Sequence, residues 1–154
     1  MGKNKETEGT LKGLSGLDYV EVRHVPMTHY ADLGEAVHSK TLGEIEKAFA
    51  RELIVGRYNL RGQEVKFLRS LLGFSQRQLA EKLKLSHVSI LKWEKAAAKP
   101  LDLVNEVSLK ALLSGFLRLK VPASLETLTG DHEIPKRMVL DYSEDVVKAR
   151  KKTA

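Results

Sequence analysis

The chain has 154 residues, of which 42% are hydrophobic, and it contains no cysteine. This length suits one compact domain or two small ones, and the lack of cysteine excludes disulfides and thiolate metal sites. The polar start lacks the apolar run of a secretory signal, and no apolar stretch reaches the ~20 residues that a membrane span needs. We therefore expect a cytoplasmic protein with no membrane partner.

The formal net charge of +6 is concentrated in one part of the chain. Residues 1–56 carry a net charge of −2, residues 57–99 carry +7, and residues 100–154 carry +1. A localised basic block is typical of nucleic-acid binding. A solvated basic face would give the same charges, so charge alone leaves both interpretations open.

The N-terminal part predicts a tail followed by strands. Residues 1–13 are polar and lack periodicity, which predicts a disordered tail. Tyr19–Val25 alternates apolar and polar residues, which predicts a strand that Pro26 ends. Glu35–His38 predicts a second short strand.

A helix is predicted next, from Thr41 to Gly56. Thr41 and Glu44 have the spacing of a capping box, in which each side chain satisfies a free N–H at the helix start. Gly56 ends the helix, because glycine adopts a positive φ at little cost. The apolar residues at helical spacing between these ends are Leu42, Ile45, Phe49 and Leu53.

The basic block predicts three short helices. Gln63–Leu72 forms the first and Gly73 ends it. Ser75 and Gln78 form a capping box at the start of the second, and Ser86 caps the third. Helices this short do not persist alone, so they must pack on one another.

Packing of the third helix predicts which of its residues face outward. Ile90 and Trp93 form its buried face, so Trp93 is expected in the core. The outer face then presents His87, Val88, Ser89 and Lys92.

The C-terminal part predicts one more helix and one strand. The helix runs from Leu101 to Ser114, with Pro100 at its start and Gly115 as its C-cap. A strand is predicted at Lys136–Tyr142, and Lys148–Lys152 is predicted to be a frayed basic end.

The basic block resembles a known family. Leu68–Ser86, followed by Ile90–Glu94 and Pro100, closely resembles the Cro/lambda-repressor-like (XRE-type) helix-turn-helix family. The sequence departs from it at Lys84, where the family has glycine, so a lysine must adopt a strained turn. Leu91 also stands where a small polar residue is usual.

The resemblance implies roles for individual residues. It implies a structural ion pair between Arg69 and Glu94, which ties the first helix to the end of the third. The residues expected to contact DNA phosphates are Ser75, Gln76, Lys95 and Lys99. Those expected to contact base edges are His87, Val88, Ser89 and Lys92.

The N-terminal segment resembles a second family. Val25–Glu35, followed by Leu42–Ile54, looks like the MqsA/YgiT-type antitoxins, in which Val-Pro precedes a zinc knuckle. Tyr30 and Leu33 stand at the cysteine positions, and the upstream cysteine pair is missing too. A metal needs a full set of ligands, and His24, His29 and His38 lack an obvious fourth partner. We therefore expect no metal and no cofactor.

These observations predict a mainly α fold. It consists of a lambda-repressor-like helix-turn-helix domain with a small N-terminal segment of β-strand plus helix. The expected divisions are a disordered tail at 1–13, a degenerate zinc-knuckle-like segment at 14–56, the helix-turn-helix domain at 57–120 and a C-terminal extension at 121–154.

The expected function is sequence-specific binding of double-stranded DNA by a transcriptional regulator, a repressor that acts as a homodimer on a palindromic operator. The residues expected at the dimer interface are Leu113, Phe116, Leu117 and Leu119. The alternative is an antitoxin that neutralises a toxin protein and autoregulates its operon. The sequence lacks metalloprotease, P-loop, dinucleotide-binding and nucleophile-elbow motifs, so we expect no catalytic residues and no enzyme.

Overall fold

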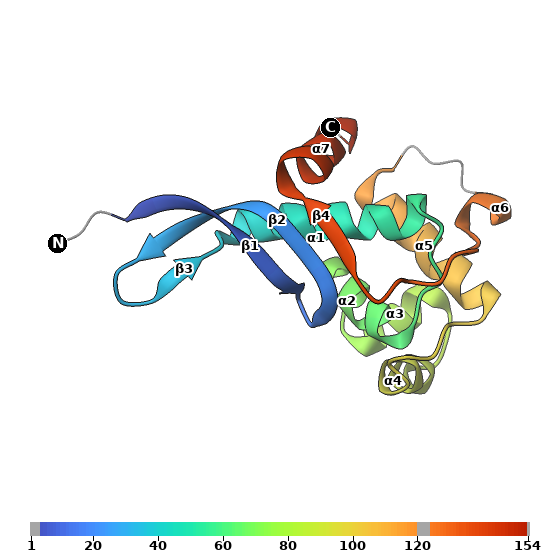
Figure 1. Ribbon diagram of the computed structural model, residues 1–154. Coiled ribbons are helices and arrows are strands. Elements are labelled where there is room, and N and C mark those ends of the chain that lie inside the picture. The colour runs from blue at the N-terminus through green and yellow to red at the C-terminus, as the bar shows by residue number, and fades with distance from the viewer. Residues whose placement is uncertain (1–3, 120–123, 154) are drawn as a thin grey trace. The chain divides into compact units, whose positions relative to one another are not determined.

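The computed structural model describes residues 4–119 and 124–153 and divides into two compact units (Figure 1). The first, the sheet unit, comprises the chain up to Phe49 together with Pro135–Lys152. The second, the helical unit, comprises Ala50–Ile134. Helix α1 (Ser39–Val55) begins in the first unit and ends in the second.

The expected mainly α fold is wrong. The structure has 51% helix and 24% strand, and four strands form one mixed sheet, so the fold is a sheet-plus-helices α/β fold. The sheet recruits β4 (Met138–Asp141) to pair in parallel with β2 (Leu17–Tyr30). Such a pairing joins segments far apart in the sequence, and no local pattern reveals it.

The N-terminal segment expected to be disordered forms strand β1 (Lys5–Leu14), while residues 1–3 lie outside the described residues. β1 and β2 form an antiparallel hairpin around Ser15 and Gly16. Both residues have positive φ, at 48° and 92°, as the tightest hairpin turns require. The backbone ladder to β2 gives order to this mostly polar strand, whose last residue, Leu14, is fully buried.

Strand β2 continues through Pro26, where the sequence predicts that it ends. Pro26 lies opposite Glu8 of β1. On the other side, β4 pairs with β2 only at Val20–Arg23, and β3 (Gly34–Ala36) pairs only at Thr28–Tyr30. Proline is tolerated in strands at such one-sided positions, because no second ladder needs its missing N–H.

The remaining strands lie near their predicted positions. β3 begins one residue before the predicted Glu35–His38 and ends at Ala36, and β4 lies within the predicted Lys136–Tyr142. One buried core joins the sheet to the first part of α1. Its fully buried residues include Leu14, Leu17, Val20, Val22, Val25, Ile45 and Phe49.

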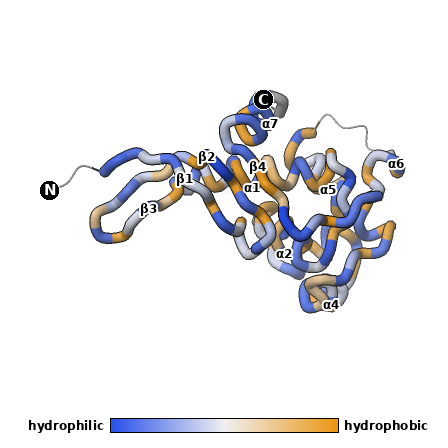
Figure 2. Tube along the Cα trace, viewed as in Figure 1, coloured by the Kyte–Doolittle hydropathy of each residue, from blue (hydrophilic) through white to orange (hydrophobic). Residues whose placement is uncertain are grey.

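Helix α1 shows the predicted apolar stripe but different ends. Hydrophobic and hydrophilic turns alternate along it (Figure 2). It begins at Ser39, so Thr41 lies inside it and the predicted capping box is wrong. Glu44 instead accepts a hydrogen bond from the Tyr142 hydroxyl at 3.2 Å. At the C-terminal end, Arg57 takes the positive φ, 55°, that was expected of Gly56.

The C-terminal end is helical where fraying was expected. A π-helical turn, η1 (Tyr142–Val146), leads into α7 (Val147–Thr153). Val146 and Ala149 are buried, at 1% and 8% exposure, and they hold this segment in place. Two small apolar residues among charged ones gave too weak a pattern to predict it.

The helical unit contains the three predicted short helices. They are α2 (Gly62–Leu72), α3 (Gln76–Leu83) and α4 (His87–Lys95). Helix α2 ends at Gly73, which has φ 74° as predicted. A short α6 (Leu125–Leu128), absent from the sequence prediction, follows later in this unit.

Helix α5 (Leu103–Leu117) is shifted from the predicted Leu101–Ser114. Its N-cap is Asp102, whose carboxylate accepts from the N–H of Asn105 at 3.3 Å. Its C-cap is Arg118 at φ 53°, so Gly115 lies within the helix. The prediction assumed that glycine takes the left-handed position, and here an arginine does.

A buried carboxylate holds the helical unit together. Glu106 of α5 is 2% exposed, and it accepts from the backbone N–H groups of Leu60 at 2.5 Å and Gly130 at 3.0 Å. Lys110, one turn later, is fully buried and donates to the carbonyl of Tyr58 at 2.6 Å. Its Nζ lies 4.0 Å from Glu106, yet burial lowers the pKa of Lys110. This pair fixes the chain before α2 and after α6 to α5.

Glu106→Ala is expected to destabilise the helical unit strongly, because it leaves two backbone N–H groups and the Lys110 ammonium buried without their carboxylate. Loss of one partner of a buried pair costs about 3–5 kcal/mol. Urea denaturation measures the loss. Glu126→Ala, at an exposed position of α6, is the matched control and should change stability little. Equal stability of the two variants would contradict the structural role of Glu106.

Candidate nucleic-acid interface

Helices α3 and α4 are joined by a three-residue turn, Lys84–Ser86. Lys84 lies in the left-handed region, at φ 58°. Its N–H bonds back to Glu81 at 3.2 Å, and the N–H of Leu85 bonds to Ala80 at 2.8 Å. The strained lysine turn inferred from the missing glycine is therefore present.

The caps of the two helices differ. Ser75 accepts from the N–H of Gln78 at 3.1 Å, and the Gln78 side chain accepts from the N–H of Ser75 at 2.8 Å, as the capping box predicts. Ser86 occupies the N-cap position of α4, but its hydroxyl makes no capping bond. It lies 3.2 Å from the Ser89 hydroxyl instead. The start of α3 is therefore more firmly fixed than that of α4.

An ion pair anchors α4 to α2. The guanidinium of Arg69 donates to both carboxylate oxygens of Glu94, at 2.8 and 2.9 Å, and also to the carbonyl of Phe74 at 3.0 Å. The side chain of Glu94 is only 6% exposed and that of Arg69 17%. The hydrogen bond from Glu94 raises the pKa of Arg69. Two parallel bonds fix orientation as well as distance.

A close backbone approach anchors the end of α4. The N–H of Gly62 donates to the carbonyl of Lys99 at 3.3 Å, and the N–H of Gln63 donates to that of Ala97 at 3.0 Å. A Cβ at Gly62 would overlap the carbonyl oxygen of Trp93. Only glycine therefore allows α2 to begin this close to α4.

The outer face of α4 is free of these anchors. Ile90 is fully buried, whereas His87, Val88 and Lys92 are exposed, Val88 at 44%. Ser89 is half-buried. The structure therefore presents three of the four predicted base-contacting residues outward and one at the edge.

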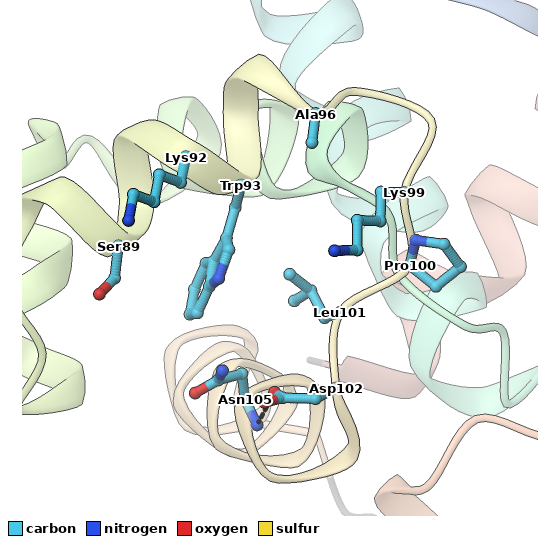
Figure 3. A pocket seen from close by; sticks show the side chains of 9 residues that line it. All are labelled: Ser89, Lys92, Trp93, Ala96, Lys99, Pro100, Leu101, Asp102 and Asn105. Atoms are coloured by element: carbon cyan, nitrogen blue, oxygen red, sulfur yellow. Dashed lines mark hydrogen bonds between the residues drawn. The ribbon is translucent and has the colours of Figure 1, made fainter.

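Trp93 is half-buried, so its prediction as a core residue needs correction. It lines an open groove of about 530 Å³ beside the end of α4. Its indole ring points toward the start of α5, and the Lys92 and Lys99 side chains lie on either side of it (Figure 3). The complete lining is Ser89, Lys92, Trp93, Ala96, Lys99, Pro100, Leu101, Asp102 and Asn105.

The residues predicted to contact phosphates divide into two groups. Ser75, Lys95 and Lys99 are exposed. Gln76 is half-buried, and its amide donates to Glu94 at 3.4 Å. Arg77, which the sequence analysis did not select, is exposed in the first turn of α3. A cation next to a helix N-terminus was the available signal, since both favour anions.

The predicted dimer-interface residues need correction. Leu113 is fully buried within its own chain and is not available to a partner. Leu117 and Leu119 are half-buried. Only Phe116, at 47% exposure, presents a large surface. The sequence analysis took Leu113 as one of several apolar residues left over at the end of the predicted helix, whereas in α5 its side chain faces the core.

The described residues include no group of three or more histidine, aspartate or glutamate side chains placed to hold a metal ion. No helix among them has the length and apolar character that a bilayer crossing requires.

No protein-family model matches the chain, and no curated protein or solved structure matches it significantly. Function must therefore be inferred from the geometry and chemistry of the site itself.

Glu94→Ala is expected to lower stability, because it leaves the Arg69 guanidinium largely buried without its partner. The cost of such a loss is about 3 kcal/mol. Thermal and urea unfolding measure it. Glu81→Ala, at an exposed position of α3, removes the same charge without a buried pair and should be nearly neutral. An unchanged midpoint for Glu94→Ala would show that the pair does not anchor α4.

Proposed function

We propose that the protein is a sequence-specific, double-stranded DNA-binding regulator of transcription that acts in the cytoplasm as a repressor. The observation that carries this proposal is the arrangement of α4. Its inner side is fixed by Ile90 and Glu94, and its outer side presents exposed His87, Val88 and Lys92. A short, firmly held helix with a free polar face suits insertion into a major groove.

Each exposed residue of α4 has a chemistry that suits base edges. The Lys92 ammonium can donate to the O6 and N7 atoms of guanine. The side chain of Val88 can pack against a thymine methyl group. The imidazole of His87 offers one donor and one acceptor. These three residues lie within two turns of one helix and would read only a few neighbouring base pairs.

Positively charged residues around α4 can attract the phosphate backbone of DNA. Residues 57–99 carry a net charge of +7. Arg77, Lys95 and Lys99 are exposed around α4, and the N-terminus of α3 favours anions. Such contacts fix the register of a protein on DNA but carry no sequence information. Affinity should therefore fall steeply as salt rises.

Two copies of α4 are needed for operator-level specificity. One recognition helix contacts too few base pairs to select a single operator among many competing sites. A homodimer on a palindromic operator doubles the number of bases read. The proposed regulator therefore acts as a two-fold dimer.

Lys92→Ala and Arg77→Ala are expected to distinguish a residue that reads bases from a residue that positions the protein on the DNA backbone. Selection from a random pool of duplexes identifies the operator, and affinities for all its single-base variants are then measured. Lys92→Ala should lose most affinity for the selected operator and relax preference at one position per half-site, because a base contact is worth about 1–3 kcal/mol. Arg77→Ala should weaken binding to all sequences by a similar factor.

Lys66→Ala is the charge-matched control, since Lys66 is an exposed lysine of α2. It should leave the base preferences unchanged. Failure of the pool to yield any enriched sequence would contradict the proposed function. Altered base preference in Arg77→Ala, with a uniform loss in Lys92→Ala, would show that the reading face is wrongly assigned.

A further inference from the structure

The open groove beside the end of α4, here called the α4 groove, lies wholly within the helical unit. The end of α4 forms one wall, the start of α5 with Asp102 and Asn105 forms the other, and the loop at residues 99–101 joins them. Its volume of about 530 Å³ falls in the range of sites that bind small molecules. The indole ring of Trp93 points across it toward α5 (Figure 3).

Backbone hydrogen bonds fix the loop side of the α4 groove. The N–H of Leu101 donates to the carbonyl of Leu60 at 2.8 Å, and the N–H of Gly62 donates to the carbonyl of Lys99 at 3.3 Å. On the other wall, the carboxylate of Asp102 caps α5. A site whose walls are fixed in advance loses little conformational entropy when a ligand binds. The α4 groove is therefore formed before a ligand arrives.

Several donors of the α4 groove are unused. The side-chain groups that make no hydrogen bond or ion pair with any residue described by the structure are the ammonium groups of Lys92 and Lys99, the amide of Asn105 and the indole N–H of Trp93. The two lysine side chains lie on either side of the indole ring (Figure 3). The groove therefore combines an aromatic ring with positive charge and free hydrogen-bond donors.

We propose that the α4 groove binds a small aromatic carboxylate, which acts as an effector of the regulator. The proposal rests on the proposed function and names the class of ligand that controls it. The ring of the ligand lies against the indole of Trp93, since aromatic rings attract one another in offset or edge-to-face arrangements. Its carboxylate lies between Lys92 and Lys99, whose ammonium groups sit on flexible stems and can both turn toward it.

The charges around the α4 groove select this class of ligand. Two lysines and one aspartate line it, which leaves a net charge of +1. A cationic ring is repelled by the lysines, and a neutral ring gains nothing from them. A doubly charged anion, such as a phosphate monoester, is attracted by the lysines but meets the carboxylate of Asp102. An aliphatic carboxylate leaves the indole of Trp93 unused.

The α4 groove and the outer face of α4 share Lys92. In the proposed function, the ammonium group of Lys92 donates to a guanine base. In the ligand complex, the same group is turned toward the groove and paired with a carboxylate. The ligand and the operator therefore compete for one side chain, and a ligand that prefers the DNA-free protein lowers the affinity for DNA. The proposed effector releases the repressor from its operator.

Trp93 is the only tryptophan of the chain, so the nuclear magnetic resonance signal of its indole N–H reports on the α4 groove directly. The full-length protein is titrated with benzoate and naphthalene-2-carboxylate as probes. Benzamide supplies a ring without the charge, and acetate supplies the charge without a ring. Both aromatic carboxylates should shift the indole signal to saturation, and benzamide and acetate should bind roughly tenfold more weakly.

Two outcomes of this titration would overturn the proposal. One is the absence of a saturable shift with either aromatic carboxylate at millimolar concentration. The other is binding of benzamide as tight as that of benzoate, since the lysines would then contribute nothing.

Lys99→Gln places the ligand in the structure. It should weaken the binding of benzoate by roughly three- to fivefold, as the loss of one exposed ion pair predicts. Lys66→Gln, at an exposed position of α2 outside the groove, removes the same charge and should leave binding unchanged. Circular dichroism establishes that both variants are folded. Equal affinities of the two variants for benzoate would show that the carboxylate binds elsewhere.

Competition with DNA tests the effector role. The affinity for the duplex selected from the random pool should fall as naphthalene-2-carboxylate is added, with acetate replacing it at constant ionic strength as the control. An unchanged affinity at a saturating concentration would overturn the effector role. If no duplex is enriched but the indole signal still shifts, the ligand site stands and the DNA-binding function fails. If the operator shifts the indole signal and no aromatic carboxylate does, the groove contacts DNA and only the effector proposal is wrong.

Discussion

The orientation of α4 depends on one ion pair. The helix has nine residues, and Ile90 is its only fully buried side chain. In a helix so short and so weakly amphipathic, burial of apolar side chains does little to keep one face outward. The bidentate bond from Arg69 to Glu94 fixes the orientation instead, because two parallel hydrogen bonds resist rotation of the helix about its own axis. The absence of a side chain at Gly62 lets the backbone of α2 hold the loop beyond α4. The exposed position of Lys92 follows from these two anchors.

The second buried pair has a consequence at the surface. Glu106 and Lys110 satisfy backbone groups of the chain before α2 and around α6, and they do so from inside the unit. Burial of two charges is costly, and hydrogen bonds from the pair to backbone groups limit that cost. The same arrangement removes every charge from the solvent side of α5. The constraint that holds the unit together therefore also leaves an uncharged surface on a basic unit.

Local sequence signals predicted the helices of the basic block well. Strand pairing between distant segments was not predicted, because no local signal reports it. The caps at Gly73 and Ser75 act within one or two turns, so the sequence reveals them directly. Strand β1 is polar, and its order comes from backbone bonds to β2, which composition does not report. The prediction of α5 failed at its end, because Arg118 rather than Gly115 takes the left-handed position. The three additional residues place Phe116 and Leu117 within the helix rather than after it.

In the proposed complex, the carboxylate of Glu94 links the residue that contacts the DNA backbone to the helix that reads the bases. Gln76, at the start of α3, donates to the same Glu94 oxygen that accepts from Arg69. A phosphate that attracts the Gln76 amide removes the weaker bond, at 3.4 Å, and leaves the two shorter bonds from Arg69 intact. The guanidinium cannot lose its proton in a protein, so the donor side of this anchor is always present. Gln76 can therefore exchange Glu94 for a DNA phosphate while α4 keeps its orientation.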